Sequence, residues 1–154
     1  MYVIYILPQN ENYIISVTPL GVVNRITNFA GSLSASNSAR INATVTYYDG
    51  FGRPYESVAL KQSPSRNDLV SMTSYSGLNR ATHQWLPISE EANGQPLSTE
   101  SFISKAGTFY NDNHPYQETL YEASALNRVV GTVRPGNEYA THPNTQSYEI
   151  NTAN

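Results

Sequence analysis

Three short segments of the chain share one pattern: a strand-like run ends in tyrosine, a turn follows, and glycine or asparagine then precedes arginine. The segments read TYYDGFGRP, TSYSGLNRA and TLYEASALNRV. The tyrosine and the arginine are five positions apart in the first two segments and seven positions apart in the third. Self-similarity of this kind predicts repeated supersecondary units that stack on one another.

The first segment predicts a β hairpin. Residues alternate with a period of two on both sides of the Asp-Gly-Phe-Gly turn, and Val45 and Tyr47 share one face of the entering strand. Gly50 and Gly52 permit a positive φ angle in the turn. Asparagine tolerates this region better than most residues, so Asn79 can take the place of Gly52 in the second turn. We expect hairpins near residues 43–60, 69–87 and 116–134.

The residue types of the motif suggest how each turn is held. Tyrosine ends the strand that enters the turn and arginine begins the strand that leaves it, so the two are near neighbours across the hairpin. A guanidinium group can lie on a ring face or donate to turn carbonyl groups. The alternative is that a tyrosine and an arginine flank a hairpin by chance. The presence of three copies in one chain argues against this alternative. We predict a structural repeat motif formed by Tyr48, Asp49, Gly52, Arg53, Tyr75, Asn79, Arg80, Tyr121, Asn127 and Arg128.

One segment departs from the strand pattern. Ser98 is a suitable helix cap, and apolar residues then recur at helical spacing, which predicts one short helix near residues 99–110. The remaining chain predicts a mainly β fold, with antiparallel hairpins that form a sheet or a partial shell. We expect an N-terminal strand or leader remnant at residues 1–11, a single β domain at residues 12–136 and a loosely held polar tail at residues 137–154.

Composition excludes several classes of protein. A formal net charge of −3 provides no basic field, so we expect no nucleic-acid partner. The chain has no cysteine, which excludes a disulfide scaffold, a thiolate metal site and a thiol nucleophile. The apolar run at the N-terminus is too short to span a bilayer, so we expect no membrane insertion. Twelve tyrosines among 154 residues favour β structure.

No motif in the sequence predicts catalysis or a cofactor. His83, His114 and His142 lack the spacing of metal ligands, and the chain has no phosphate-binding glycine loop. We therefore expect a protein that is not an enzyme, while a hydrolase with an acid pair formed only by folding stays open as a remote alternative. Aromatic rings on a β surface can stack on sugars or peptides, so Trp85 and Tyr116 are possible ligand-facing residues of a carbohydrate- or peptide-binding module.

The repeated pattern resembles the YD repeat of bacterial RHS-type proteins. The segment YYDGFGR is close to the Tyr-Asp-x-x-Gly-Arg core of that repeat. The second copy has Ser76 and Asn79 in place of the aspartate and the glycine, and the third copy is looser. Over residues 12–136 the chain is similar to the N-terminal region that precedes the repeat array in RHS-like proteins of Bacteroidetes.

The resemblance implies a non-catalytic structural module. Full-length relatives of this type are large and are exported or displayed at the cell surface, and their repeats form a β-sheet shell. Many carry a variable C-terminal toxin domain. The resemblance supplies no catalytic residues for these positions. It implies that the partner is the downstream repeat shell of a longer chain, or another copy of the chain that pairs through open sheet edges.

Overall fold

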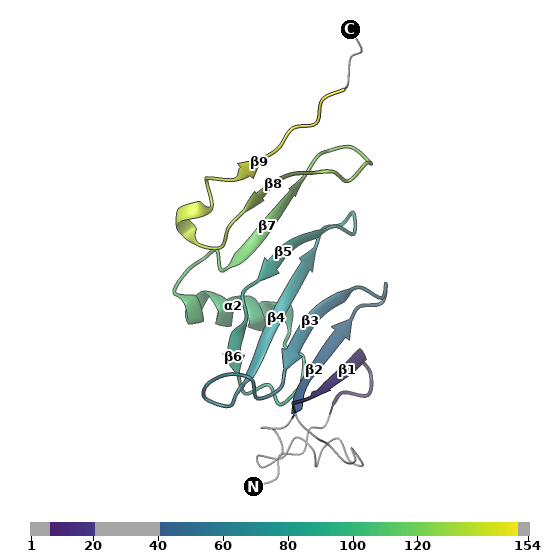
Figure 1. Ribbon diagram of the computed structural model, residues 1–154, viewed down its shortest axis with the longest axis vertical. Helices are drawn as coiled ribbons and strands as arrows, with labels where there is room; N and C mark the ends of the chain where they lie inside the picture. The colour runs from purple at the N-terminus through teal and green to yellow at the C-terminus, as the bar shows by residue number, and fades with distance from the viewer. Residues whose placement is uncertain (1–6, 21–40, 151–154) are drawn as a thin grey trace. The chain divides into compact units, whose positions relative to one another are not determined.

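The computed structural model describes residues 7–20 and 41–150, and Figure 1 shows their secondary structure. The described strands are β1 (Asn12–Pro19), β2 (Ile41–Tyr48), β3 (Pro54–Ala59), β4 (Asp68–Tyr75), β5 (Ala81–Trp85), β6 (Ile88–Glu90), β7 (Tyr116–Tyr121), β8 (Val129–Val133) and β9 (Asn144–Thr145). All of their pairings are antiparallel. The predicted mainly β fold built of antiparallel hairpins is therefore confirmed.

The predicted helix is also confirmed. The α-helix in the described part of the chain is α2 (Thr99–Tyr110). Ser98 caps it, because its Oγ accepts a hydrogen bond of 3.2 Å from the backbone N–H of Ser101. Phe102 and Ala106, one turn apart, are fully buried. The helix ends before Asn111, which has a left-handed φ of 49°.

The chain forms two compact units. Unit 1 comprises Met1–Met72 and Pro87–Ile103, and unit 2 comprises Thr73–Leu86 and Ser104–Asn154. The single β domain that we expected over residues 12–136 stays a prediction. The division falls within β4, because the first part of this strand pairs with β3 and β6 and its last part pairs with β5. A sequence pattern records a continuous strand and contains no information on where its partner changes.

Unit 1 contains β1, β2, β3, the first part of β4, and β6. Buried and less buried residues alternate along β2, β3 and β4, as expected for strands with one face on a core. The largest fully buried apolar side chains of this unit are Tyr47, Phe102, Leu60, Ile88, Val45, Val58 and Val70. The burial of these side chains supplies the main favourable term for folding of the unit.

Unit 2 contains the last residues of β4 together with β5, β7, β8 and β9. The segment 137–154, expected as a loosely held polar tail, includes the 3-10 helix η1 (Asn137–Tyr139) and β9, which pairs with β8. Polar side chains do not prevent this pairing, because the ladder is made by backbone N–H and C=O groups. At the other end of the chain, residues 9–11 form a turn and a bend before β1, and residues 1–6 lie outside the described residues.

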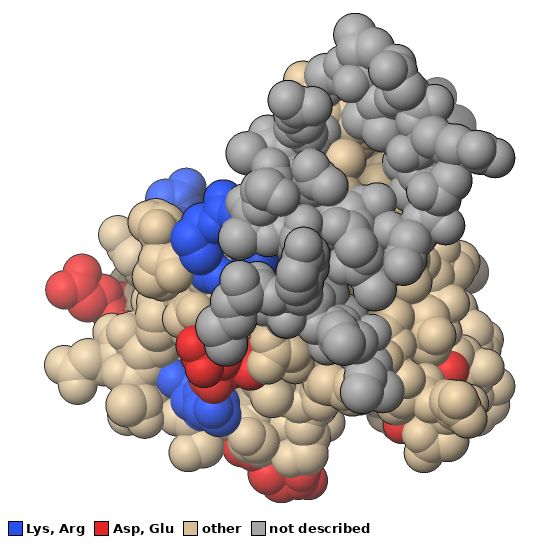
Figure 2. All heavy atoms as spheres, turned by 90° about the horizontal axis from the view of Figure 1, so that it is seen from below, with Lys and Arg blue, Asp and Glu red and all other residues tan. Residues whose placement is uncertain are grey.

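The surface carries charges of both signs. Figure 2 shows acidic and basic side chains interspersed among uncharged ones on the described part of the face seen from below. No helix among the described residues is long and apolar enough to cross a membrane.

Candidate functional site

The three motif hairpins share one backbone design. The hairpins are β2–β3, β4–β5 and β7–β8, and each shows a register shift at its motif tyrosine. The tyrosine pairs with the residue that follows the arginine, and the next residue of the returning strand is passed over. The three pairs are Tyr48 with Pro54, Tyr75 with Ala81 and Tyr121 with Val129. A β-bulge at the same position in each copy shows that the sequence repeat is also a structural repeat.

The residue before the arginine has the same conformation in all three turns. Gly52 has a φ of 76°, Asn79 a φ of 61° and Asn127 a φ of 56°. All three lie in the left-handed region, which glycine and asparagine tolerate best. The glycine or asparagine of the motif is therefore required by the turn itself, independently of any ligand.

In the first and third turns, the arginine is held by the residue that follows the tyrosine. Arg53 Nε donates to Asp49 Oδ2 at 2.8 Å, and Arg128 Nε donates to both carboxylate oxygens of Glu122 at 2.9 Å. These bonds lower the pKa of Asp49 and bring the pKa of Glu122 down to about 2. The charged hydrogen bonds close each turn, because a carboxylate matches the guanidinium fork better than a ring does.

The second turn has serine at the carboxylate position, and its arginine has a different set of partners. Arg80 Nη1 donates to the backbone carbonyl of Glu122 at 2.9 Å, and Nη2 donates to that of Ser124 at 3.1 Å. The Arg80 guanidinium carbon lies 5.4 Å from the ring centre of Tyr121. In return, Tyr121 Oη donates to the carbonyl of Ala81 at 3.0 Å. Arg80 and Tyr121 thus connect hairpin β4–β5 to hairpin β7–β8 within unit 2.

This connection is a contact that the sequence motif did not predict. We predicted that the tyrosine and arginine of one hairpin would clamp its own turn. Arg80 also lies over the tyrosine of the following hairpin, and Arg53 lies over Phe51, with its guanidinium carbon 5.1 Å from the ring centre.

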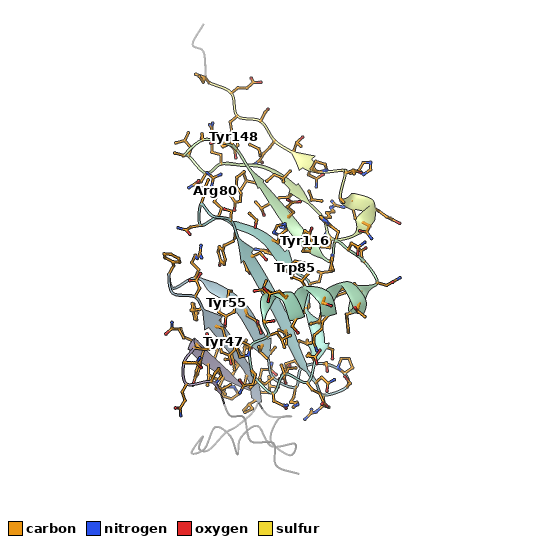
Figure 3. The ribbon with its side chains drawn as sticks, turned by 180° about the vertical axis from the view of Figure 1, so that it is seen from behind. Tyr47, Tyr55, Arg80, Trp85, Tyr116 and Tyr148 are labelled. Atoms are coloured by element: carbon orange, nitrogen blue, oxygen red, sulfur yellow. The ribbon has the colours of Figure 1, made fainter. Side chains whose placement is uncertain are left out.

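The two aromatic residues proposed as ligand-facing lie together in unit 2. Trp85 and Tyr116 are a cross-strand pair, with ring centres 4.5 Å apart, and Figure 3 labels both. His83 and His114 also pack on Tyr116, with ring centres at 4.6 Å and 4.0 Å. Trp85 Nε1 donates to Ser74 Oγ at 3.0 Å. These half-buried rings contact one another, which is the arrangement of a packed cross-strand cluster.

The histidines offer little for metal chemistry. His83 Nε2 lies 3.9 Å from Glu118 Oε1, and burial lowers the pKa of His83, so the neutral form is favoured. Within residues 7–20 and 41–150, no group of three or more histidine, aspartate or glutamate side chains is placed to hold a metal ion.

Two buried carboxylates in unit 1 were not singled out from the sequence. Both oxygens of Glu56 accept the backbone N–H of Leu97, at 3.0 and 3.2 Å. Asp68 accepts the backbone N–H groups of Lys61 and Gly94, at 2.9 and 2.8 Å. Both carboxylates therefore hold loops, including the segment that joins β6 to α2. The sequence signal that could have identified them is the period-two alternation of the strands. It places Glu56 on the same strand face as Val58, and Asp68 on the same face as Val70.

Each turn also exposes a large apolar side chain two residues before the arginine. Phe51 is 78% exposed, Leu78 is 70% exposed and Leu126 is 69% exposed. We did not predict a role for these positions from the sequence, although they are equivalent in the three aligned copies of the motif.

Comparison with known proteins places the chain in a family. The chain belongs to the family described as Domain of unknown function (DUF6443), whose model matches residues 22–152. No curated protein and no solved structure matches the chain. The family description names no activity and no ligand, so a functional proposal depends on the geometry of the repeated hairpins.

Proposed function

We propose that the chain is a non-catalytic structural module that begins an array of stacked β hairpins. One observation carries the proposal: three hairpins share one bulged design, and Arg80 and Tyr121 connect two of them through paired contacts. The carboxylates of Asp49, Glu56, Asp68 and Glu122 and the rings of Trp85 and Tyr116 are engaged in contacts within the chain. The repeated features therefore serve the connection of hairpins to one another, as in a repeat protein in which each unit contacts its neighbours.

The N-terminal strand supports a starting role. In the pairing of successive hairpins, the residue three places after the arginine faces the residue three places before the next tyrosine, as in Glu56 with Met72 and His83 with Glu118. β1 pairs antiparallel with β2, and its residue opposite Tyr48 is Asn12. β1 thus occupies the place of a returning strand but carries asparagine where the repeat has arginine. We infer that β1 lies outside the repeat motif and covers the edge of the first motif hairpin.

The sequence resemblance supplies the biological setting of the proposal. In this setting the module resembles the segment that precedes the repeat shell of RHS-type proteins of Bacteroidetes, and it belongs to an exported or cell-surface protein. Its partner is the downstream repeat shell, or a second copy that pairs through a sheet edge. A carbohydrate- or peptide-binding role is less well supported, because Trp85 and Tyr116 pack on each other and on two histidines.

The native gene product tests this proposal. An antibody raised against residues 41–148 is used to probe fractionated cells of the source organism, with and without protease treatment of intact cells. We expect a product much larger than this chain that is exported or exposed to the protease. A product of the size of this chain that stays inside the cell would contradict the proposal.

A further inference from the structure

The C-terminal segment repeats a contact that connects two hairpins in the middle of the chain. Tyr148 Oη donates to the carbonyl of Val129 at 3.1 Å, and the Arg128 guanidinium carbon lies 4.7 Å from the centre of the Tyr148 ring. Figure 3 labels this tyrosine. Val129 directly follows Arg128, just as Ala81 follows Arg80 in the contact that Tyr121 makes. Tyr148 therefore contacts the third hairpin in the same way as Tyr121 contacts the second.

The strand register agrees with this equivalence. β8 pairs with β9 through Gly131 opposite Thr145, and Gln146 N–H donates to the carbonyl of Val130 at 2.9 Å. Gly131 lies three places after the motif arginine, and Thr145 lies three places before Tyr148. Glu56 with Met72 and His83 with Glu118 have the same spacing. The pairing of β8 with β9 is thus the pairing of one repeat with the next.

The residue after Tyr148 completes the comparison. Tyr48 is followed by Asp49 and Tyr121 by Glu122, and in both cases the carboxylate binds the arginine that returns from the turn. Tyr148 is followed by Glu149, which is exposed and forms no ion pair with another described residue. β9 lies at the end of the strand order and pairs with β8 alone among the described strands.

We propose that residues 144–149 are the entering strand of a fourth hairpin, and that the outer edge of β9 binds a returning antiparallel strand. The first residue of that strand is an arginine, preceded by glycine or asparagine, and its guanidinium pairs with Glu149. The partner is thus a further repeat of the same design, which rests on the proposed function and assigns it a binding edge. An open edge offers unpaired N–H and C=O groups to such a strand.

A chain with an added returning strand tests the proposal. Residues 150–154 are replaced by a copy of residues 123–134, so that Tyr148 and Glu149 precede the turn and strand that follow Tyr121 and Glu122. Amide hydrogen exchange of residues 144–149 is measured by NMR. We expect slower exchange by about tenfold, the factor that one added hydrogen bond of typical net strength contributes. The same graft with its arginine changed to alanine, or on a Glu149→Gln chain, should lose most of this gain.

A second variant examines the same design in the chain without a graft. Tyr148→Phe removes the bond to Val129 and should speed exchange of the Gln146 amide severalfold, whereas Tyr139→Phe, in η1, should leave it unchanged. Equal protection with a graft of scrambled sequence, or no effect of Tyr148→Phe, would overturn the proposal. If cell fractionation shows a large exported product but the graft does not slow amide exchange, only the proposed fourth hairpin is rejected. If the graft slows amide exchange of residues 144–149 but the native product is small and stays inside the cell, only the proposed function is rejected.

Discussion

Glu56 shows how one buried charge can make the stability of unit 1 depend on pH. The side chain is almost fully buried, and burial raises its pKa from 4.5 to about 7, while the hydrogen bond from Leu97 N–H acts in the opposite direction. Between these two values the folded chain keeps a proton that the unfolded chain has released. The free energy of unfolding therefore falls as pH rises through this range.

We predict that this decrease amounts to roughly 3 kcal/mol at most between pH 4.5 and 7. Above pH 7, Glu56 should no longer change the free energy of unfolding. Urea unfolding at a series of pH values measures the slope. Glu56→Gln retains an acceptor for Leu97 N–H and should remove most of the slope. Glu91→Gln, at an exposed position, should leave the slope intact. An unchanged slope in Glu56→Gln would show that another group titrates.

The first turn allows a matched test of backbone strain. A methyl group at Gly50 or Gly52 meets nothing within 4 Å, but only Gly52 has a positive φ, at +76°. Gly52→Ala should therefore cost about 1–2 kcal/mol, from the left-handed conformation alone. Gly50→Ala should be nearly neutral, and Gly52→Asn should cost less than Gly52→Ala. Chemical denaturation compares the three variants, and equal losses at both glycines would contradict the conformational explanation.

At the scale of elements, the hairpin is the repeated unit and the arginine decides what holds it. Where an acidic residue follows the tyrosine, the arginine forms an ion pair within its own turn. Where serine follows, Arg80 donates to carbonyl groups of the next hairpin. The motif therefore has two uses, turn closure and connection between hairpins, and Arg128 serves both, because it pairs with Glu122 and lies over the Tyr148 ring.

The connection between hairpins predicts a specific loss. Tyr121→Phe keeps the ring under Arg80 but leaves the Ala81 carbonyl without its donor, and should cost about 0.5–1.5 kcal/mol. Arg80→Lys loses the planar fork that reaches two carbonyl groups, so it should cost at least as much. Thermal unfolding measures both variants, with Tyr139→Phe as the control. Stabilities equal to that of the control would contradict a structural link.

At the scale of the whole molecule, the two units have unequal cores. Among the described residues with buried apolar side chains, Ala106, Pro115 and Val133 belong to unit 2, and all the others belong to unit 1. Unit 2 relies more on half-buried ring contacts and on polar bonds such as those of Arg80. Regions with few buried apolar contacts open more readily than well-packed ones.

We therefore predict that the backbone amides of β7 and β8 exchange faster with solvent than those of β2 and β3. Native-state hydrogen exchange followed by NMR measures both sets in one sample. Val58→Ala, in the core of unit 1, should lower the protection of β2 and β3 because it leaves a small cavity. Equal protection in both units of the unmodified chain would contradict the difference inferred from burial.

Local features were predictable from sequence because they depend on neighbouring residues. Alternation along β2 and β3 follows from a strand with one buried face, and α2 follows from apolar spacing and the Ser98 cap. The same alternation placed Glu56 beside Val58 on the buried face. It did not identify what binds that carboxylate, because Leu97 lies 41 residues away.

By itself, the sequence determined the hairpins, their turns and the helix, since each depends on contacts within about a dozen residues. Only the tertiary structure decided the partners. Arg80 reaches carbonyl groups 42 and 44 residues away, and Tyr148 occupies the place of a motif tyrosine in a segment that we expected to be a loose tail. Such pairings depend on strand order and register, and these emerge when backbone groups pair across long loops.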